Sequence, residues 1–116
     1  MPVGKFIYEN DTRLDIDDRV LLHLQSVIGA KLRRGEAFTF NWTVDRSLGS
    51  GRTTVWLHPH SSIVFSYSGS RRAQLNRRWL EALMFAANSS AGLHVVPEPA
   101  ELPDERASDD EISVPM

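Results

Sequence analysis

The sequence predicts a small α+β domain with the element order ββαβββαβ, in which two helices cover one face of a mostly antiparallel sheet. Two stretches repeat apolar residues at the three- and four-residue spacing of amphipathic helices. Shorter stretches alternate apolar and polar residues, as strands do. With 116 residues, of which 41% are hydrophobic, the chain is long enough for one modest core.

The N-terminal part predicts a hairpin followed by a helix. Residues 5–8 and 13–16 form two short strands on either side of a turn. Asp17 or Asp18 then caps the helix, because a carboxylate there accepts free backbone N–H groups and complements the helix dipole. Gly35 can take a left-handed conformation, so we expect it to end the helix. The apolar positions of this helix are Val20, Leu21, Leu24, Val27, Ile28 and Leu32.

Three strands and a second helix are predicted next. Residues 38–44 alternate most clearly, and residues 53–57 and 63–67 follow. The second helix is expected to begin between Ser70 and Gln74, and residues 93–96 add a final strand. The apolar stripe of this helix is Leu75, Trp79, Leu83 and Ala86.

Charge is divided unevenly along the chain. Residues 31–80 contain nine basic and two acidic residues, whereas residues 97–116 contain seven acidic residues, one basic residue and four of the six prolines. Such a tail buries too little apolar surface to offset the entropy lost on ordering. We therefore predict one folded domain over residues 1–96 and a disordered acidic tail over residues 97–116.

The second helix supplies the candidate binding site. Four arginines precede or occupy its first turns, and no acidic residue lies among them before Glu81. Positive side chains at a helix N-terminus lower the stability of the helix, and a helix N-terminus is itself an anion site. Arginines placed there nevertheless favour a surface that contacts the phosphate groups of DNA or RNA. The alternative is a solvated arginine-rich face touched by the acidic tail. The candidate nucleic-acid-binding residues are Arg71, Arg72, Arg77 and Arg78, assisted by Arg46 and Arg52 from the glycine-rich loop.

Other chemistries have weaker signals, and we predict no catalytic residue, no metal and no cofactor. The chain has no cysteine. His58 and His60, with His94, could offer three imidazoles to a metal, but a His-Pro-His segment is ordinary turn chemistry. The loop at residues 49–51 leads into a strand, unlike a Walker loop. His23 is expected on the polar side of the first helix, without a special role.

A protein-interaction module, such as an antitoxin, immunity or adaptor-like domain, is the alternative function. Trp42 and Trp79 are expected in the core, whereas Trp56 and His58 are expected to face outward, where a protein partner could meet the sheet. No apolar run reaches the roughly 18 residues of a membrane span, and no secretory signal is visible. We therefore expect a cytoplasmic protein without membrane contact, and the oligomeric state stays open.

Several stretches resemble a family of small actinobacterial proteins of uncharacterised function. The similar stretches are residues 4–8, 16–19, 30–36, 51–59, 75–83 and 92–99, which begin Gly-Lys-Phe-Ile-Tyr and end Val-Val-Pro-Glu-Pro. Members are often labelled "ATP-dependent DNA ligase". Neither lysine fits the Lys-x-Asp-Gly motif of such ligases, since the two read Lys5-Phe6-Ile7-Tyr8 and Lys31-Leu32-Arg33-Arg34. The resemblance thus implies at most an accessory module beside the repair machinery and supplies no catalytic residue.

Overall fold

The computed structural model describes residues 2–43, 51–69 and 74–100. Within these residues the predicted α+β class and element order are confirmed. The elements are β1 (Val3–Tyr8), β2 (Thr12–Asp17), α1 (Asp18–Arg33), β3 (Phe38–Thr43), β4 (Arg52–Leu57), β5 (Ile63–Ser66), α2 (Arg77–Ala87) and β6 (Leu93–His94).

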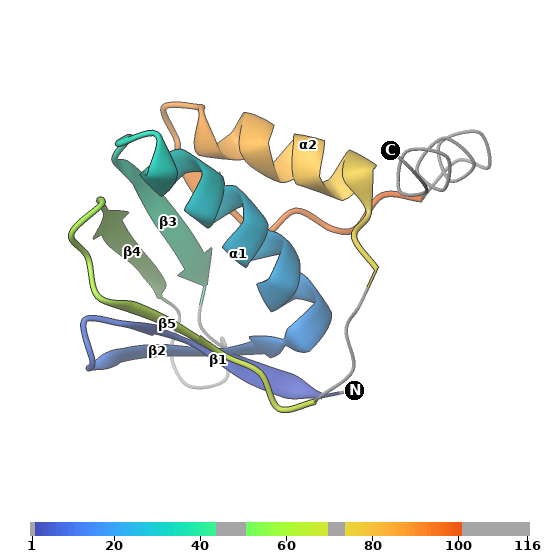
Figure 1. Cartoon of the computed structure of the whole chain (residues 1–116), viewed down its shortest axis with the longest axis horizontal. Helices are drawn as coiled ribbons and strands as arrows, with labels where there is room; N and C mark the ends of the chain where they lie inside the picture. The colour runs from blue at the N-terminus through green and yellow to red at the C-terminus, as the bar shows by residue number, and fades with distance from the viewer. Residues whose placement is uncertain (1, 44–50, 70–73, 101–116) are drawn as a thin grey trace.

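The strands form two three-stranded sheets, with the orders β2-β1-β5 and β4-β3-β6 (Figure 1). We call them the β1 sheet and the β3 sheet after their central strands. Neighbouring strands are antiparallel except β3 and β6, which are parallel. The mostly antiparallel pairing is as predicted, whereas the division into two sheets has no signal in the sequence. It arises because β5 pairs with β1 instead of β4, helped by the backbone N–H of Glu9 donating to the Ser62 carbonyl at 2.8 Å.

Both ends of α1 match the sequence signals. The Asp17 side chain accepts a hydrogen bond from the backbone N–H of Arg19, and Asp18 lies in the first turn. After the C-cap residue, Gly35 has a φ of +76°, a conformation that costs glycine little. The helix is therefore bounded by local chemistry that was visible in the sequence.

The start of α2 was predicted wrongly. The helix begins at Arg77, and residues 74–76 are not helical. Asn76 is the N-cap, because its Oδ1 accepts hydrogen bonds from the backbone N–H groups of Arg78 at 3.0 Å and Trp79 at 3.3 Å. Leu75, which the apolar spacing had placed on the buried stripe, precedes the helix and is 42% exposed.

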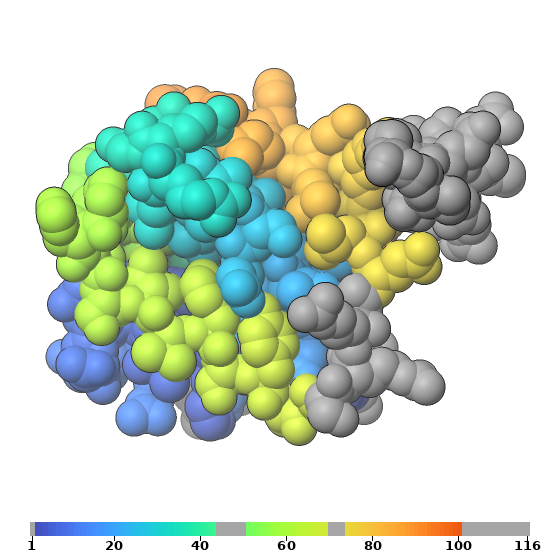
Figure 2. Space-filling model, in the orientation of Figure 1, coloured from blue at the N-terminus to red at the C-terminus, as the bar shows by residue number. Residues whose placement is uncertain are grey.

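The core lies between the two helices and the inner faces of both sheets. In Figure 1, α1 runs across the sheets with α2 beside it, and Figure 2 shows α1 at the surface between the green β5 segment and α2. Phe6 is fully buried and joins the two sheets, because its ring lies 5.2 Å from Phe40, 5.9 Å from Trp42 and 5.8 Å from Phe65 between centroids. Among the described helices, neither is long and apolar enough to cross a membrane.

Candidate nucleic-acid interface

Two of the predicted arginines lie together at the start of α2. Arg77 and Arg78 are its first two residues, and the first turn has no acidic side chain. A cation at this end of a helix costs about 0.3–1 kcal/mol when exposed, because the N-terminus is the positive end of the dipole. The two arginines therefore lie at the end of the helix where positive charge is least favourable for helix stability.

Arg52, the remaining predicted arginine that the structure describes, is not brought to this place. Arg52 is the first residue of β4, an edge strand of the β3 sheet, whereas α2 packs against α1 and against β3 and β6 of that sheet. Arg46, Arg71 and Arg72 lie outside the described residues. The three predicted arginines that the structure describes thus divide between the α2 start and the far edge of the β3 sheet.

One basic residue of the middle segment is not a surface charge. Lys31 is only 5% exposed. Its Nζ donates to Asn88 Oδ1 at 2.6 Å, pairs with Glu36 Oε1 at 3.0 Å and lies 5.3 Å from the centre of the Phe38 ring. Lys31 therefore joins the C-terminal ends of the two helices and cannot reach a polyanion.

The outer face of the β3 sheet is a second candidate surface, because the predicted site residue Arg52 lies on it. Strand alternation turns Phe38, Phe40 and Trp42 inward, and the register places their neighbours opposite one another on the outer side. We call this surface the open face, because the helices cover the opposite side of the sheet. The open face consists of Thr39, Asn41, Thr43, Arg52, Thr54, Trp56 and His94.

Polar contacts fix β6 at one edge of the open face. Asn41 Nδ2 donates to the Ala91 carbonyl at 2.9 Å, and Thr54 Oγ1 donates to Asn41 Oδ1. Gly92 has a φ of +89°, and a Cβ there would lie 2.1 Å from Thr39 Oγ1, so the close approach requires glycine. The turn before β6 thus packs against Thr39 and Asn41 and leaves the rest of the open face exposed.

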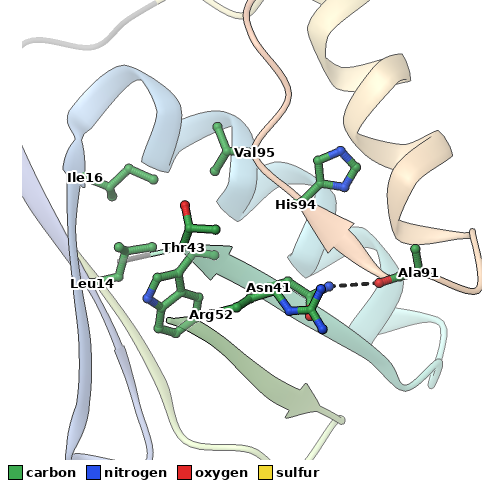
Figure 3. Close-up of a pocket in the computed structure, with 9 residues that line it drawn as sticks. Leu14, Ile16, Asn41, Thr43, Arg52, Ala91, His94 and Val95 are labelled. Atoms are coloured by element: carbon green, nitrogen blue, oxygen red, sulfur yellow. Dashed lines mark hydrogen bonds between the residues drawn. The ribbon is translucent and has the colours of Figure 1, made fainter. Parts of the chain in front are cut away.

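A cavity of about 470 Å³ opens beside this face, between β2, β3 and β6 (Figure 3). Leu14 and Ile16 line one side of the cavity, and His94 lies across from them. Arg52, at the end of the open face, lines the same cavity. Its volume is in the range of small-molecule sites, which combine apolar walls with a few polar groups. The remaining lining residues are Asn41, Trp42, Thr43, Ala91 and Val95.

The structure overturns the prediction for His23. Its side chain is fully buried, and its ring lies 4.4 Å from the Trp79 ring between centroids. Nε2 accepts a hydrogen bond from the backbone N–H of Asn76, so Nδ1 carries the proton and donates to the Arg19 carbonyl, both at 2.8 Å. Burial lowers the pKa of His23 below its usual 6.5. The missed signal is its spacing of three residues from Val20 and four from Val27, which places it on the apolar face.

Glu98 closes this polar cluster from the C-terminal segment. Its carboxylate accepts two hydrogen bonds from Arg19, at 2.9 and 2.6 Å, and one from Asn76 Nδ2 at 2.9 Å. The Arg19 contact is the main reason why the pKa of Glu98 falls to about 2. Together with the bond from Trp79 Nε1 to the Val96 carbonyl at 2.7 Å, these contacts hold the chain beyond the boundary expected at residue 96.

The histidines do not gather into a metal site. The rings of His58 and His60 lie 6.3 Å apart between centroids in the turn after β4, where the backbone N–H of His60 donates to His58 Nδ1 at 3.2 Å. His94 belongs to β6. No three side chains of His, Asp or Glu within the described ranges come close enough together to hold a metal ion.

A family model described as a domain of unknown function, DUF7882, matches residues 3–98. The chain belongs to the DUF7882 family. The match runs from β1 to Glu98, so it includes both sheets, both helices and the Glu98 contacts. No curated protein and no solved structure gives a significant match. The site of this DUF7882 domain must therefore be interpreted from its own residues.

Proposed function

We propose that this DUF7882 domain is a non-catalytic domain that binds the sugar–phosphate backbone of a nucleic acid through Arg77 and Arg78. The observation that carries the proposal is the position of this pair, in a helix turn that disfavours cations and contains no acidic side chain. Arg71 and Arg72, which lie outside the described residues, are predicted to contribute with this pair, and Arg46 and Arg52 are secondary contacts.

The side chains, and not the helix backbone, are the phosphate ligands in this proposal. The Asn76 side chain already accepts hydrogen bonds from the backbone N–H groups of Arg78 and Trp79, so two of the free donors of an ordinary helix start are occupied here. A guanidinium group can still donate two parallel hydrogen bonds to phosphate oxygens. Binding of this kind is weakly sequence-specific and strongly salt-dependent, because it works by neutralising phosphates and releasing counterions.

The resemblance to small actinobacterial proteins labelled as DNA ligases agrees with a nucleic-acid partner. It supports an accessory role beside DNA repair or ligation, since the sequence offers no Lys-x-Asp-Gly motif for the ligation chemistry itself. The proposal therefore places the domain at the nucleic acid as a binding module.

A titration of full-length protein with labelled single- and double-stranded DNA and RNA, followed by fluorescence anisotropy, tests the proposal. The double variant Arg77→Glu, Arg78→Glu should abolish binding at about 50 mM salt, and the wild type should lose most of its affinity by about 200 mM. Acidic residues in a first helix turn favour the helix, so the variant should stay folded.

The matched control is Arg33→Glu, Arg34→Glu, which changes the net charge equally at the other end of a helix. Arg33 is in the last turn of α1 and Arg34 is its C-cap. This control should lose less than about threefold in affinity. Equal losses in the two double variants, or wild-type protein that binds no nucleic acid, would contradict the proposal.

A protein partner is the second candidate, and exposed aromatic side chains favour it. Phe85, on the outer side of α2, is 79% exposed, and Trp56 is 57% exposed. Large exposed apolar side chains are enriched where proteins meet. A specific partner captured by the wild type but not by Phe85→Ser, after nuclease treatment and at high salt, would favour this function over nucleic-acid binding.

A further inference from the structure

We infer that the open face of the β3 sheet is a binding surface for unpaired bases of a single-stranded nucleic acid, with Trp56 as the stacking platform and Arg52 as a phosphate contact. The inference rests on the proposed function, because it assumes that the partner is a nucleic acid. It adds a second surface to the α2 start and names the form of nucleic acid that this surface fits.

The position of Trp56 is the first observation. Trp56, on β4, is 57% exposed, whereas the aromatic residues of the neighbouring β3, Phe38, Phe40 and Trp42, are buried on the inner side of the same sheet. Its backbone is held in place, because Tyr8 Oη donates to the Trp56 carbonyl. An aromatic ring on a fixed strand is the feature by which sheet surfaces stack bases of single strands.

The charge of the open face is the second observation. None of its seven residues is acidic, and Arg52 and His94 are its basic ones. No ion pair joins Arg52 to an acidic side chain within the described residues, whereas Lys5, Arg19 and Lys31 each pair with one. Among the described residues the face is thus complementary to a polyanion, with the positive charge of Arg52 at one end.

The spacing of these groups suits a strand laid along β4. Arg52 and Trp56 are four residues apart on the same face, which is about 13 Å along an extended strand, the length of a few nucleotides. The cavity at the Arg52 end has apolar walls at Leu14 and Ile16 and hydrogen-bonding groups at Thr43 and His94. Such a lining matches the apolar faces and polar edges of a base.

Unpaired bases are required because a duplex hides the base surfaces that Trp56 would contact. In double-stranded nucleic acid the bases are stacked on their neighbours, and only their edges are accessible in the grooves. Stacking on an exposed indole therefore selects single strands, and the sequence preference should be small because every base has a flat π-face. Duplex binding would depend on the arginines and not on Trp56.

The test measures full-length protein against a labelled deoxythymidine oligonucleotide of about ten nucleotides, an RNA of the same length and a duplex. Trp56→Ala should weaken single-strand binding by about tenfold, as expected for the loss of one stacking contact, while Trp56→Phe stays within about threefold. Duplex affinity should not change in either variant. Phe85→Ala is the matched control, since it removes another exposed aromatic ring, and it should leave all affinities unchanged.

Intrinsic fluorescence gives an independent readout. Trp79 is buried and Trp42 is only 9% exposed, so most of the emission that a bound oligonucleotide quenches should come from Trp56. Quenching should be strong in the wild type and much weaker in Trp56→Phe, where Trp42 at the cavity is the one tryptophan left near the bound strand. Because the Trp56 side chain is exposed, circular dichroism should show that both variants are folded.

The outcomes separate the two proposals. Single-strand binding that needs Arg77 and Arg78 but is identical in Trp56→Ala would overturn the inference and leave the proposed function standing. Equal losses for single strands and duplex in Trp56→Ala would also overturn it, because stacking would not explain them. Wild-type protein that binds no oligonucleotide would overturn both.

Discussion

The outer faces of the two sheets have the same architecture and opposite chemistry. Both belong to three-stranded sheets whose inner faces pack toward the helices. On the β1 sheet, Lys5 and Asp15 are directly opposite in the register and form an ion pair at 2.9 Å. On the β3 sheet, Arg52 is opposite Thr43, and Trp56 is opposite Thr39. The first face thus pairs its Lys5 with an acidic side chain of the neighbouring strand, whereas the second leaves Arg52 and the Trp56 ring exposed to solvent.

This difference shows what alternation in a strand can and cannot tell. The period of two identifies which side chains face outward in both sheets. It does not say whether an outward charge has a partner, because the partner belongs to a neighbouring strand. The pairing register supplies that information, because it shows which outward charges lie opposite a charge of the other sign on the neighbouring strand.

The largest expected effect comes from breaking the joint between the sheets. Phe6→Ala removes the ring that contacts Phe40, Trp42 and Phe65 at once, so we expect a loss of about 3–5 kcal/mol in the free energy of unfolding. Urea unfolding measures it. Phe85→Ala, the exposed control, should change stability by less than about 0.5 kcal/mol. A loss below about 1 kcal/mol for Phe6→Ala would mean that the sheets do not depend on this joint.

A matched pair of charge reversals tests the comparison of the outer faces directly. Arg52→Glu on the β3 sheet should weaken single-strand binding by about tenfold and lower the slope of the salt dependence. Arg13→Glu, on the exposed side of the β1 sheet, changes the net charge equally and should lower affinity by less than about threefold. Equal losses in anisotropy titrations would mean that net charge alone governs binding and that the two faces do not differ in function.

The smallest expected effect concerns the stability of the fold and involves neither outer face. The paired Glu98 carboxylate has a pKa of about 2, so its stabilisation is complete above the pKa of about 4.5 in the unfolded chain and is lost as the pH falls toward 2. We expect it to amount to about 1 kcal/mol, because the pair is one-third exposed and solvent screens it. Glu98→Gln should therefore flatten the stability profile below about pH 4.5 in thermal unfolding.

His23 supplies the internal control for the same pH series. Its pKa is lowered in the folded state, so the unfolded chain takes up a proton first and stability falls as the pH drops below about 6.5. Glu98→Gln should retain this upper slope. A profile in which Glu98→Gln and the wild type coincide down to pH 3 would show that the Arg19 contact does not stabilise the fold.

Local signals predict the elements better than their arrangement. Periodicity identified both helices and the strand order, because apolar spacing is a property of the element itself. The start of α2 was misplaced because Leu75 fits the helical spacing, although Asn76 is a strong N-cap residue. The pairing of β5 with β1, and of β6 with β3, depends on contacts between distant parts of the chain, which spacing cannot reveal.

The candidate site was predictable only in its parts. The outward position of Trp56 follows from alternation, whereas Arg52, expected in the glycine-rich loop, is the first residue of β4. Their membership of one acid-free face needs the register and the position of β6. The composition of residues 97–116 predicts that Glu98 belongs to a disordered tail. Composition averages over many residues, so it does not reveal that this one carboxylate contacts Arg19 and Asn76.

The parallel pairing of β6 has a consequence for the order in which the domain is completed during synthesis. All strands of the β1 sheet precede residue 67, so that sheet can form while α2 is still unmade. Asn41, in contrast, gains its hydrogen bond to the Leu93 carbonyl only after Leu93, 52 residues later, has been synthesised. β3 and β4, with Arg52 and Trp56, can pair early, but the edge of this surface that β6 and His94 supply is finished only after the C-terminal segment has emerged from the ribosome.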